Sequence, residues 1–330
     1  MMDSTSLFTK FLNKTKNYFK NFKLLSWVAM MKKIALITGA NSGIGLATAL
    51  DLARTGVTVC LACRNMTKAE AARQQILQAV PTATVELYQL DLSSFESIRN
   101  MVESYKKNHH CLDVLINNAG TAPLKQHLTE DGFELQFGVN YLGPFLLTHL
   151  LLPLLEAAVP ISGEARIVHV ASIAHMLGRL DEATFCGKTP YRPASAYAQS
   201  KLCNLMFNFA LARRLPKGVT TQAFHPGGVD SDIWRDLPRL VYLLLRLFLI
   251  SPERAGIMAV DLAVGSAHKG ETGGYYSVQW PRPVSRTARD VEKQDWLYQK
   301  SCELAGIAGL DKAVYQKPKP FLASRENVQV

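Results

Sequence analysis

Residues 1–31 contain a single acidic side chain, Asp3, and no long apolar run. A helix that spans a bilayer needs about 20 consecutive apolar residues, so this segment is not a spanning helix. It also lacks the apolar core and the small-residue cleavage site of a secretory signal. Residues 1–33 hold seven lysines against that one acid, which accounts for six of the ten net positive charges. The rest of the chain is only mildly basic, and we expect no nucleic-acid partner.

A disulfide framework is also missing, because the six cysteines show no pattern of paired spacings. Cys60 and Cys63 have the spacing of a redox pair, but they fall in an apolar run that predicts a strand. Residues three apart on a strand point to opposite faces of the sheet. We therefore interpret them as core cysteines of a protein in a reducing compartment, and we predict no metal site.

The basic segment at 1–31 is amphipathic. Its apolar residues recur at helical spacing, while most of its lysines lie elsewhere around the helix. These apolar residues are Phe8, Phe11, Leu12, Phe19 and Phe22. The pattern is typical of a helix that lies on a membrane surface. A mitochondrial presequence and a disordered extension are the two alternatives for this segment.

From residue 32 the pattern alternates between apolar strands and helices, which predicts parallel βαβ units. We expect one α/β domain at 32–310, with a doubly wound parallel sheet of about seven strands, and a tail at 311–330. The expected strands are 34–38, 57–63, 85–90, 112–117, 166–171, 220–224 and 275–278. The expected helices are 45–55, 68–80, 95–107, 132–155 (interrupted near Gly143) and 194–215. An apolar stretch at 237–250 is too short to span a bilayer. Its place after the sixth expected strand favours a helix that covers the substrate or faces lipid, as a lid at about 233–252, and a core helix is the alternative.

A glycine turn follows the first expected strand. Gly39, Gly43 and Gly45 stand where the chain must turn tightly into a helix and let a pyrophosphate approach. Between a strand and a helix, this spacing indicates a dinucleotide site in a Rossmann-type fold. The residues expected to contact the cofactor at this turn are Gly39, Asn41, Ser42, Gly43, Ile44 and Gly45.

The second expected strand ends without the carboxylate that an NAD-preferring site uses to bind the ribose diol. Arg64 stands there instead. A guanidinium is well suited to a 2′-phosphate, so we predict NADP(H) as the cofactor. The alternative is an ordinary surface arginine at a strand end.

Tyr197 and Lys201 are four residues apart, which places them on the same face of an expected helix. A free tyrosine ionises near pH ~10, so it exchanges protons poorly at neutral pH. A neighbouring ammonium favours the phenolate and lowers the pKa of the tyrosine. The pair is a candidate for acid/base chemistry, although this spacing also arises by chance on solvated helices.

Together, the glycine turn and the Tyr197–Lys201 pair resemble the short-chain dehydrogenase/reductase family. Longer runs resemble its retinol dehydrogenase branch over roughly residues 32–305. These runs are 61–65, 114–120, 131–134, 145–152, 172–175, 177–179, 197–202 and 211–215. One departure is Pro144, which stands where that branch often has a histidine.

The resemblance implies four catalytic residues, namely Asn140, Ser172, Tyr197 and Lys201. In it Tyr197 is the general acid/base, and Lys201 lowers the pKa of Tyr197 and binds the nicotinamide ribose. Ser172 polarises the carbonyl, and Asn140 helps to hold a water-based proton relay. The further cofactor contacts that it implies are Asp91, Asn118, Ala119, Gly120, Pro226 and Gly227. His175 is expected to line the substrate pocket or to be structural.

The function implied by the resemblance is an NADP(H)-dependent oxidoreductase that interconverts lipophilic, retinol-like alcohols and their aldehydes or ketones. It implies a membrane location, at the endoplasmic reticulum or alternatively at mitochondria, and a homodimer. A steroid or xenobiotic carbonyl reductase of the same fold is one alternative. A non-catalytic NADP(H)-binding sensor or scaffold is another. Such sensors typically lose the tyrosine or the lysine, and this chain keeps both.

Overall fold

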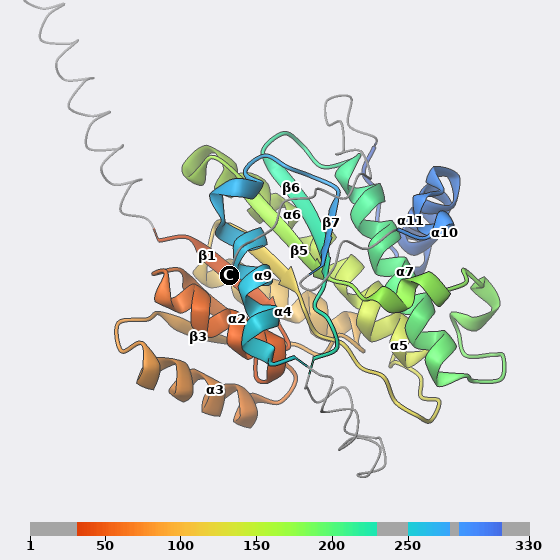
Figure 1. The fold of residues 1–330 in the computed structure, drawn as a ribbon, viewed down its shortest axis with the longest axis horizontal. Coiled ribbons are helices and arrows are strands. Elements are labelled where there is room, and N and C mark those ends of the chain that lie inside the picture. The colour runs from red at the N-terminus through yellow and green to blue at the C-terminus, as the bar shows by residue number, and fades with distance from the viewer. Residues whose placement is uncertain (1–31, 230–249, 278–283, 312–330) are drawn as a thin grey trace, which may run out of the picture.

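The computed structural model describes residues 32–229, 250–277 and 284–311. The expected membrane-surface segment at 1–31, most of the expected lid and all but the first residue of the expected tail lie outside these residues. The described chain forms one seven-stranded sheet (Figure 1). Its strands are β1 (Ile34–Thr38), β2 (Thr58–Cys63), β3 (Val85–Gln89), β4 (Val114–Asn117), β5 (Ala165–Val170), β6 (Val219–His225) and β7 (Gly274–Ser277). The expected sheet of seven strands is confirmed.

All neighbouring strands are parallel, and their order is β3-β2-β1-β4-β5-β6-β7. Strands β2, β5 and β6 are buried along their whole length, which is why they read as apolar runs in the sequence. After β3 the chain returns to the far side of β1 and continues as β4. This reversal between β1 and β4 opens a crevice at the carboxyl ends of the strands, where ligands bind in doubly wound sheets.

Helices cover both faces of the sheet (Figure 1). One face carries α2 (Gly43–Arg54), α3 (Met66–Ala79) and α9 (Pro252–Val264). The other carries α4 (Phe95–Asn108), α6 (Gly143–Ser162) and α7 (Pro193–Ala212), with α11 (Val291–Ala305) packed on α7. The remaining helical segments are α5 (Leu135–Phe137), the π-helical turn η1 (Gly138–Leu142), η2 (Ile173–Leu177), η3 (Glu182–Thr184), η5 (Ser266–His268) and α10 (Arg286–Arg289).

The expected interruption near Gly143 takes the form of the π-helical turn that ends at Leu142, and the segment stays helical from residue 135 to residue 162. Pro144 stands in the first turn of α6, directly after the π-helical turn, and the helix continues past it. Gly143 serves packing instead, since a Cβ there would lie 2.5 Å from the carbonyl oxygen of Leu92. Helices α9, α10 and α11 were not predicted.

The segment 135–162 is the one helix in the described part of the chain that is long and apolar enough to cross a membrane. Half of its most apolar stretch is nevertheless buried inside the protein. His149 Nε2 lies 2.8 Å from the Tyr298 hydroxyl of α11, and Phe145 packs against the same ring. These contacts explain the apolar character of this helix by its place in the core of the protein. The homodimer stays a prediction.

Candidate active site

The turn between β1 and α2 requires glycine at three places. Gly39 and Gly43 have φ angles of +65° and +52°, in the left-handed region that favours glycine. A Cβ on Gly45 would lie 2.5 Å from both the Gly39 carbonyl oxygen and Asn118 Nδ2. The Ser42 side chain at the N-cap of α2 makes no capping hydrogen bond with any described residue, and the first turn has no acidic residue. The amides at this helix N-terminus are therefore suited to an anion such as a pyrophosphate.

Thr38, which the sequence reasoning missed, fastens this turn to the end of β4. Its hydroxyl oxygen accepts hydrogen bonds from the backbone amides of Asn118 and Ala119, both at 3.0 Å. Asn118 Nδ2 donates in turn to the Thr38 carbonyl oxygen at 2.8 Å. The 118–120 turn is thus held against the glycine turn by the last residue of β1. A hydroxyl at the end of that strand is the only sequence signal for this role.

A cleft of about 1090 Å³ lies beside the carboxyl ends of β1, β2, β4, β5 and β6. It gathers fifteen of the seventeen predicted site residues into one wall. These are Gly39, Asn41, Ser42, Gly43, Ile44, Arg64, Asp91, Asn118, Ala119, Gly120, Ser172, Tyr197, Lys201, Pro226 and Gly227. The other two, Gly45 and Asn140, lie behind the cleft surface and support it.

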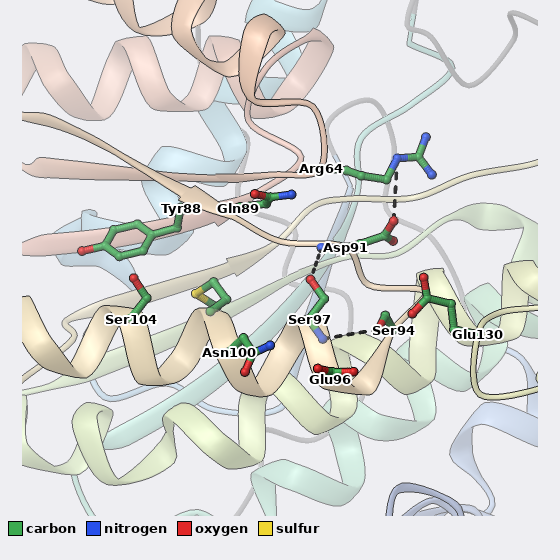
Figure 2. A pocket seen from close by; sticks show the side chains of 11 residues that line it. Arg64, Tyr88, Gln89, Asp91, Ser94, Glu96, Ser97, Asn100, Ser104 and Glu130 are labelled. Atoms are coloured by element: carbon green, nitrogen blue, oxygen red, sulfur yellow. Dashed lines mark hydrogen bonds and ion pairs between the residues drawn. The ribbon is translucent and has the colours of Figure 1, made fainter.

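Arg64 and Asp91 both line the cleft, and Figure 2 shows the ion pair between them. Arg64 Nε lies 4.0 Å from Asp91 Oδ2, and the arginine side chain is 68% exposed. Asp91 Oδ1 accepts hydrogen bonds from the amide and the hydroxyl of Ser93, at 2.9 and 2.7 Å. The carboxylate is therefore held in place, while the guanidinium lies at the outer limit of an ion pair with it and stays largely exposed to solvent. A second, polar groove of about 550 Å³ along α4 shares both residues (Figure 2).

Ser172, Tyr197 and Lys201 line the same cleft. Ser172 follows β5, and its hydroxyl oxygen accepts a hydrogen bond from the Ala174 amide at 3.2 Å. Lys201 Nζ donates to the Val170 carbonyl oxygen at 2.9 Å and lies 5.8 Å from the centroid of the Tyr197 ring. A strand end and one face of α7 thus bring a hydroxyl, a phenol and an amine into one pocket.

Burial dominates the proton affinities of this group. It raises the pKa of Tyr197, and a hydrogen bond with Ser172 opposes that increase. It lowers the pKa of Lys201 to about 8. Desolvation of the phenolate is the largest effect on Tyr197 and raises its net pKa, and the expectation that Lys201 lowers this pKa stays a prediction.

Asn140 sits in the π-helical turn and is almost fully buried. Its Oδ1 accepts from the Thr121 amide at 2.7 Å, and its Nδ2 donates to the Thr121 carbonyl oxygen at 2.9 Å. Nδ2 also donates to the Ser200 hydroxyl at 3.0 Å, and that hydroxyl donates to the Tyr197 carbonyl oxygen at 2.9 Å. Asn140 therefore links the loop after β4 to the backbone of Tyr197. Ser200 was missed, and its place between Tyr197 and Lys201 is the only sequence signal for it.

The cleft continues past Ser172 and Tyr197 between apolar side chains. Pro123, Leu135, Val139, Ala174 and Leu177 line this part. Leu177 is 83% exposed, so an apolar side chain stands open to solvent at the rim. A hydrophobic molecule with one polar oxygen fits this distribution of side chains, with that oxygen directed toward Ser172 and Tyr197.

Comparisons with known proteins agree with this architecture. A family model described as short chain dehydrogenase matches residues 33–239. Retinol dehydrogenase 12 of Mus musculus is 41% identical over 278 residues, which cover 83% of this chain and 87% of that protein. Retinol dehydrogenase 13 of Homo sapiens is 37% identical over 302 residues, which cover 87% of this chain and 88% of that protein.

Solved structures share the fold. An uncharacterised protein from Mycobacterium Paratuberculosis has a TM-score of 0.67 at 33% identity, covering 86% of this chain and 98% of its own. Two others hold a nicotinamide nucleotide. A short chain dehydrogenase from Shigella flexneri holds NADP; its TM-score is 0.59 at 23% identity, and the match covers 75% of this chain and 97% of its own. A 3-ketoacyl-(acyl-carrier-protein) reductase from Brucella melitensis holds NADH; its TM-score is 0.60 at 25% identity, and the match covers 74% of this chain and 96% of its own. This chain is an oxidoreductase and belongs to the short-chain dehydrogenase/reductase family, in its retinol dehydrogenase-like branch.

Proposed function

We propose that this chain is an NADP(H)-dependent enzyme that interconverts lipophilic alcohols and their aldehydes or ketones, with Tyr197 as the general acid/base. The observation that carries the proposal is the common wall formed by the glycine turn, Ser172, Tyr197 and Lys201 in one cleft. It joins a site for a dinucleotide to a site for proton transfer. An apolar extension of the same cleft leads outward from the proton-transfer groups.

The residues of the cleft fit a nicotinamide nucleotide. A Cβ on Gly39 or Gly45 would collide with the turn at the start of α2. The free amides of this helix N-terminus suit a pyrophosphate. The exposed Arg64 would bind a 2′-phosphate, which supports NADP(H) over NAD(H). Lys201 would bind the ribose next to the reacting ring. The bound nicotinamide supplies or accepts the hydride of the reaction.

The chain's own residues handle the proton. In the reduction direction the Tyr197 hydroxyl donates its proton to the substrate oxygen, and in the oxidation direction the phenolate takes it back. Ser172 stabilises the charge that develops on the same oxygen by hydrogen bonding. With a pKa of about 8, Lys201 is mostly protonated at neutral pH, and its charge then favours the phenolate of Tyr197. Asn140 holds the backbone on which these groups stand.

The substrate class follows from the apolar part of the cleft, and the names of the relatives suggest a retinol-like alcohol. We further propose that the chain works at a membrane surface, at the endoplasmic reticulum, with the segment 1–31 as its contact. This rests on the amphipathic pattern of that segment and on the membrane origin of lipophilic substrates. A steroid or xenobiotic carbonyl compound is the alternative substrate.

Purified protein incubated with NADPH and retinal, medium-chain aldehydes or steroid ketones tests the proposal. We expect the fastest turnover with the most lipophilic aldehydes, and a loss of at least about 100-fold in kcat for Tyr197→Phe, as typical of a general acid. NADP(H) binding without turnover of any compound would favour the sensor. Turnover that Tyr197→Phe leaves unchanged would refute the mechanism.

A further inference from the structure

His175 is a fully buried residue three positions after Ser172, in the short helix η2. Within the described residues it stays out of the substrate cleft, whose lining includes Ser172, Ile173, Ala174 and Leu177 around it. Its ring lies behind the turn that carries Ser172. A buried imidazole with no access to substrate needs another explanation than acid/base chemistry.

The hydrogen bonds of the ring define which nitrogen carries the proton. The Ser285 backbone amide lies 3.3 Å from Nε2, and because an amide N–H can only donate, Nε2 must be the bare acceptor. Nδ1 then carries the proton and donates to the Ser172 carbonyl oxygen at 2.8 Å. Burial lowers the pKa of His175, which keeps the ring neutral and this tautomer in place.

Several contacts hold the ring in this orientation. Tyr275 of β7 meets it edge to face, with centroids 5.3 Å apart at 82°. The His175 backbone amide donates to the same Ser172 carbonyl oxygen at 3.2 Å, so that oxygen accepts two hydrogen bonds. Ser285 itself is fixed because its hydroxyl caps α10 by accepting from the Ala288 amide at 3.2 Å.

We propose that His175 is a positioning residue that orients Ser172 toward the substrate oxygen by fixing the Ser172 peptide from behind. The proposal rests on the role of Ser172 in the proposed function. Ser172 lies in an extended conformation immediately before η2, and a displacement of its carbonyl group would move the Cα that carries the hydroxyl relative to Tyr197. His175 ties that peptide to the start of α10, which packs with α11 on α7, the helix of Tyr197 and Lys201.

A double-mutant cycle distinguishes positioning from general structural support. We expect His175→Leu, which keeps the bulk but loses both hydrogen bonds, to lower kcat about 10- to 100-fold, as small misplacements of reacting groups do. The KM and the Kd for NADPH should change less than about twofold. His175→Gln can still donate to Ser172 and accept from Ser285, so it should recover most of kcat.

In the Ser172→Ala background, His175→Leu should lower kcat further by less than about twofold. If both losses multiply in the double variant, His175 does not act through Ser172, and the proposal is overturned. Nitrogen NMR of the wild-type ring is a second test that needs no variant to fold. We expect the neutral ring to be protonated at Nδ1 at about pH 8, and a neutral ring protonated at Nε2 would overturn the proposal.

The two proposals fail in different ways. A wild-type enzyme that turns over none of the carbonyl compounds would refute the proposed function, and the positioning role with it. A fully active wild type whose kcat depends on Ser172 and Tyr197 but not on His175 would refute the positioning role alone. Circular dichroism spectra of all variants establish that the comparison is made between folded proteins.

Discussion

Replacing Lys201 with methionine is expected to abolish turnover and yet to stabilise the folded protein at neutral pH. The side chain is 4% exposed, and burial lowers its pKa from about 10.5 to about 8. The folded state therefore opposes the charge that the proposed mechanism requires on this residue. Methionine has a similar length and no charge, so it removes the desolvation penalty while largely keeping the packing.

The magnitude follows from the two pKa values. Their difference corresponds to about 3 kcal/mol of unfavourable free energy when the lysine is charged in the folded protein. The variant also loses the hydrogen bond from Nζ to the Val170 carbonyl oxygen, which contributes about 1 kcal/mol. The balance is a gain of about 2 kcal/mol in the free energy of unfolding at about pH 7.

The effect has a defined dependence on pH. Between about pH 8 and pH 10.5 the unfolded state binds more protons at this site than the folded state does, so the stability of the wild type rises with pH. The penalty is fully present below about pH 8 and has gone above about pH 10.5. The advantage of Lys201→Met should therefore shrink across this window and then change sign.

Urea unfolding followed by circular dichroism, without added nucleotide and at half-unit steps from about pH 7 to pH 10, measures this difference. Lys188→Met is the matched control, because Lys188 is exposed and its ammonium stays hydrated in both states. Other alkaline titrations occur equally in the wild type and the variant, so they cancel in the comparison. A difference between wild type and Lys201→Met that stays constant over this range would refute the reasoning.

Two further predictions concern the cofactor end of the cleft. Arg64→Ala should lower kcat/KM with NADPH about tenfold and change kcat/KM with NADH by less than about twofold, because only NADPH carries the 2′-phosphate. Initial rates measure both values, and equal losses with the two cofactors would contradict this prediction. Gly45→Ala should lower the free energy of unfolding in urea by about 2–3 kcal/mol, because its Cβ would collide with Gly39 and Asn118. Gly163→Ala is the control, because a Cβ at Gly163 would meet open space and only the positive φ of 83° opposes it, at a cost of about 1 kcal/mol. A larger loss of stability for Gly163→Ala than for Gly45→Ala would contradict the packing argument.

The central strands could be predicted because they are buried on both faces and read as short apolar runs between turn signals. Helix α9 was missed although Ser251 caps it, Pro252 opens it and Glu253 stands in its first turn. Helix α11 is polar on average, and only a stripe that includes Leu297 and Tyr298 is buried. Its stability depends on packing against α7, which local sequence does not reveal.

The glycine turn and the Tyr197–Lys201 pair could be predicted because each is a short-range pattern, and the two in this order along an alternating strand–helix chain support each other. The role of His175 could not, because its partner Ser285 lies 110 residues further along the chain. The raised pKa of Tyr197 was also beyond the sequence. A neighbouring ammonium predicts a decrease, and only the three-dimensional structure shows that desolvation of the phenolate outweighs it.

Three of the groups that serve the proposed reaction are not fully stabilised by the folded protein itself. The first turn of α2 has no acidic residue or side-chain cap from Ser42, and Lys201 and Tyr197 both resist their charged forms. A nucleotide phosphate would provide a partner for the amides at the N-terminus of α2, and a ribose would provide one for the Lys201 ammonium. Binding of NADP(H) should therefore raise the melting temperature strongly, since a ligand stabilises the folded state by RT ln(1 + [L]/Kd). If the uncapped helix is the anion site, inorganic pyrophosphate alone should give part of that increase, and Gly45→Ala should remove it.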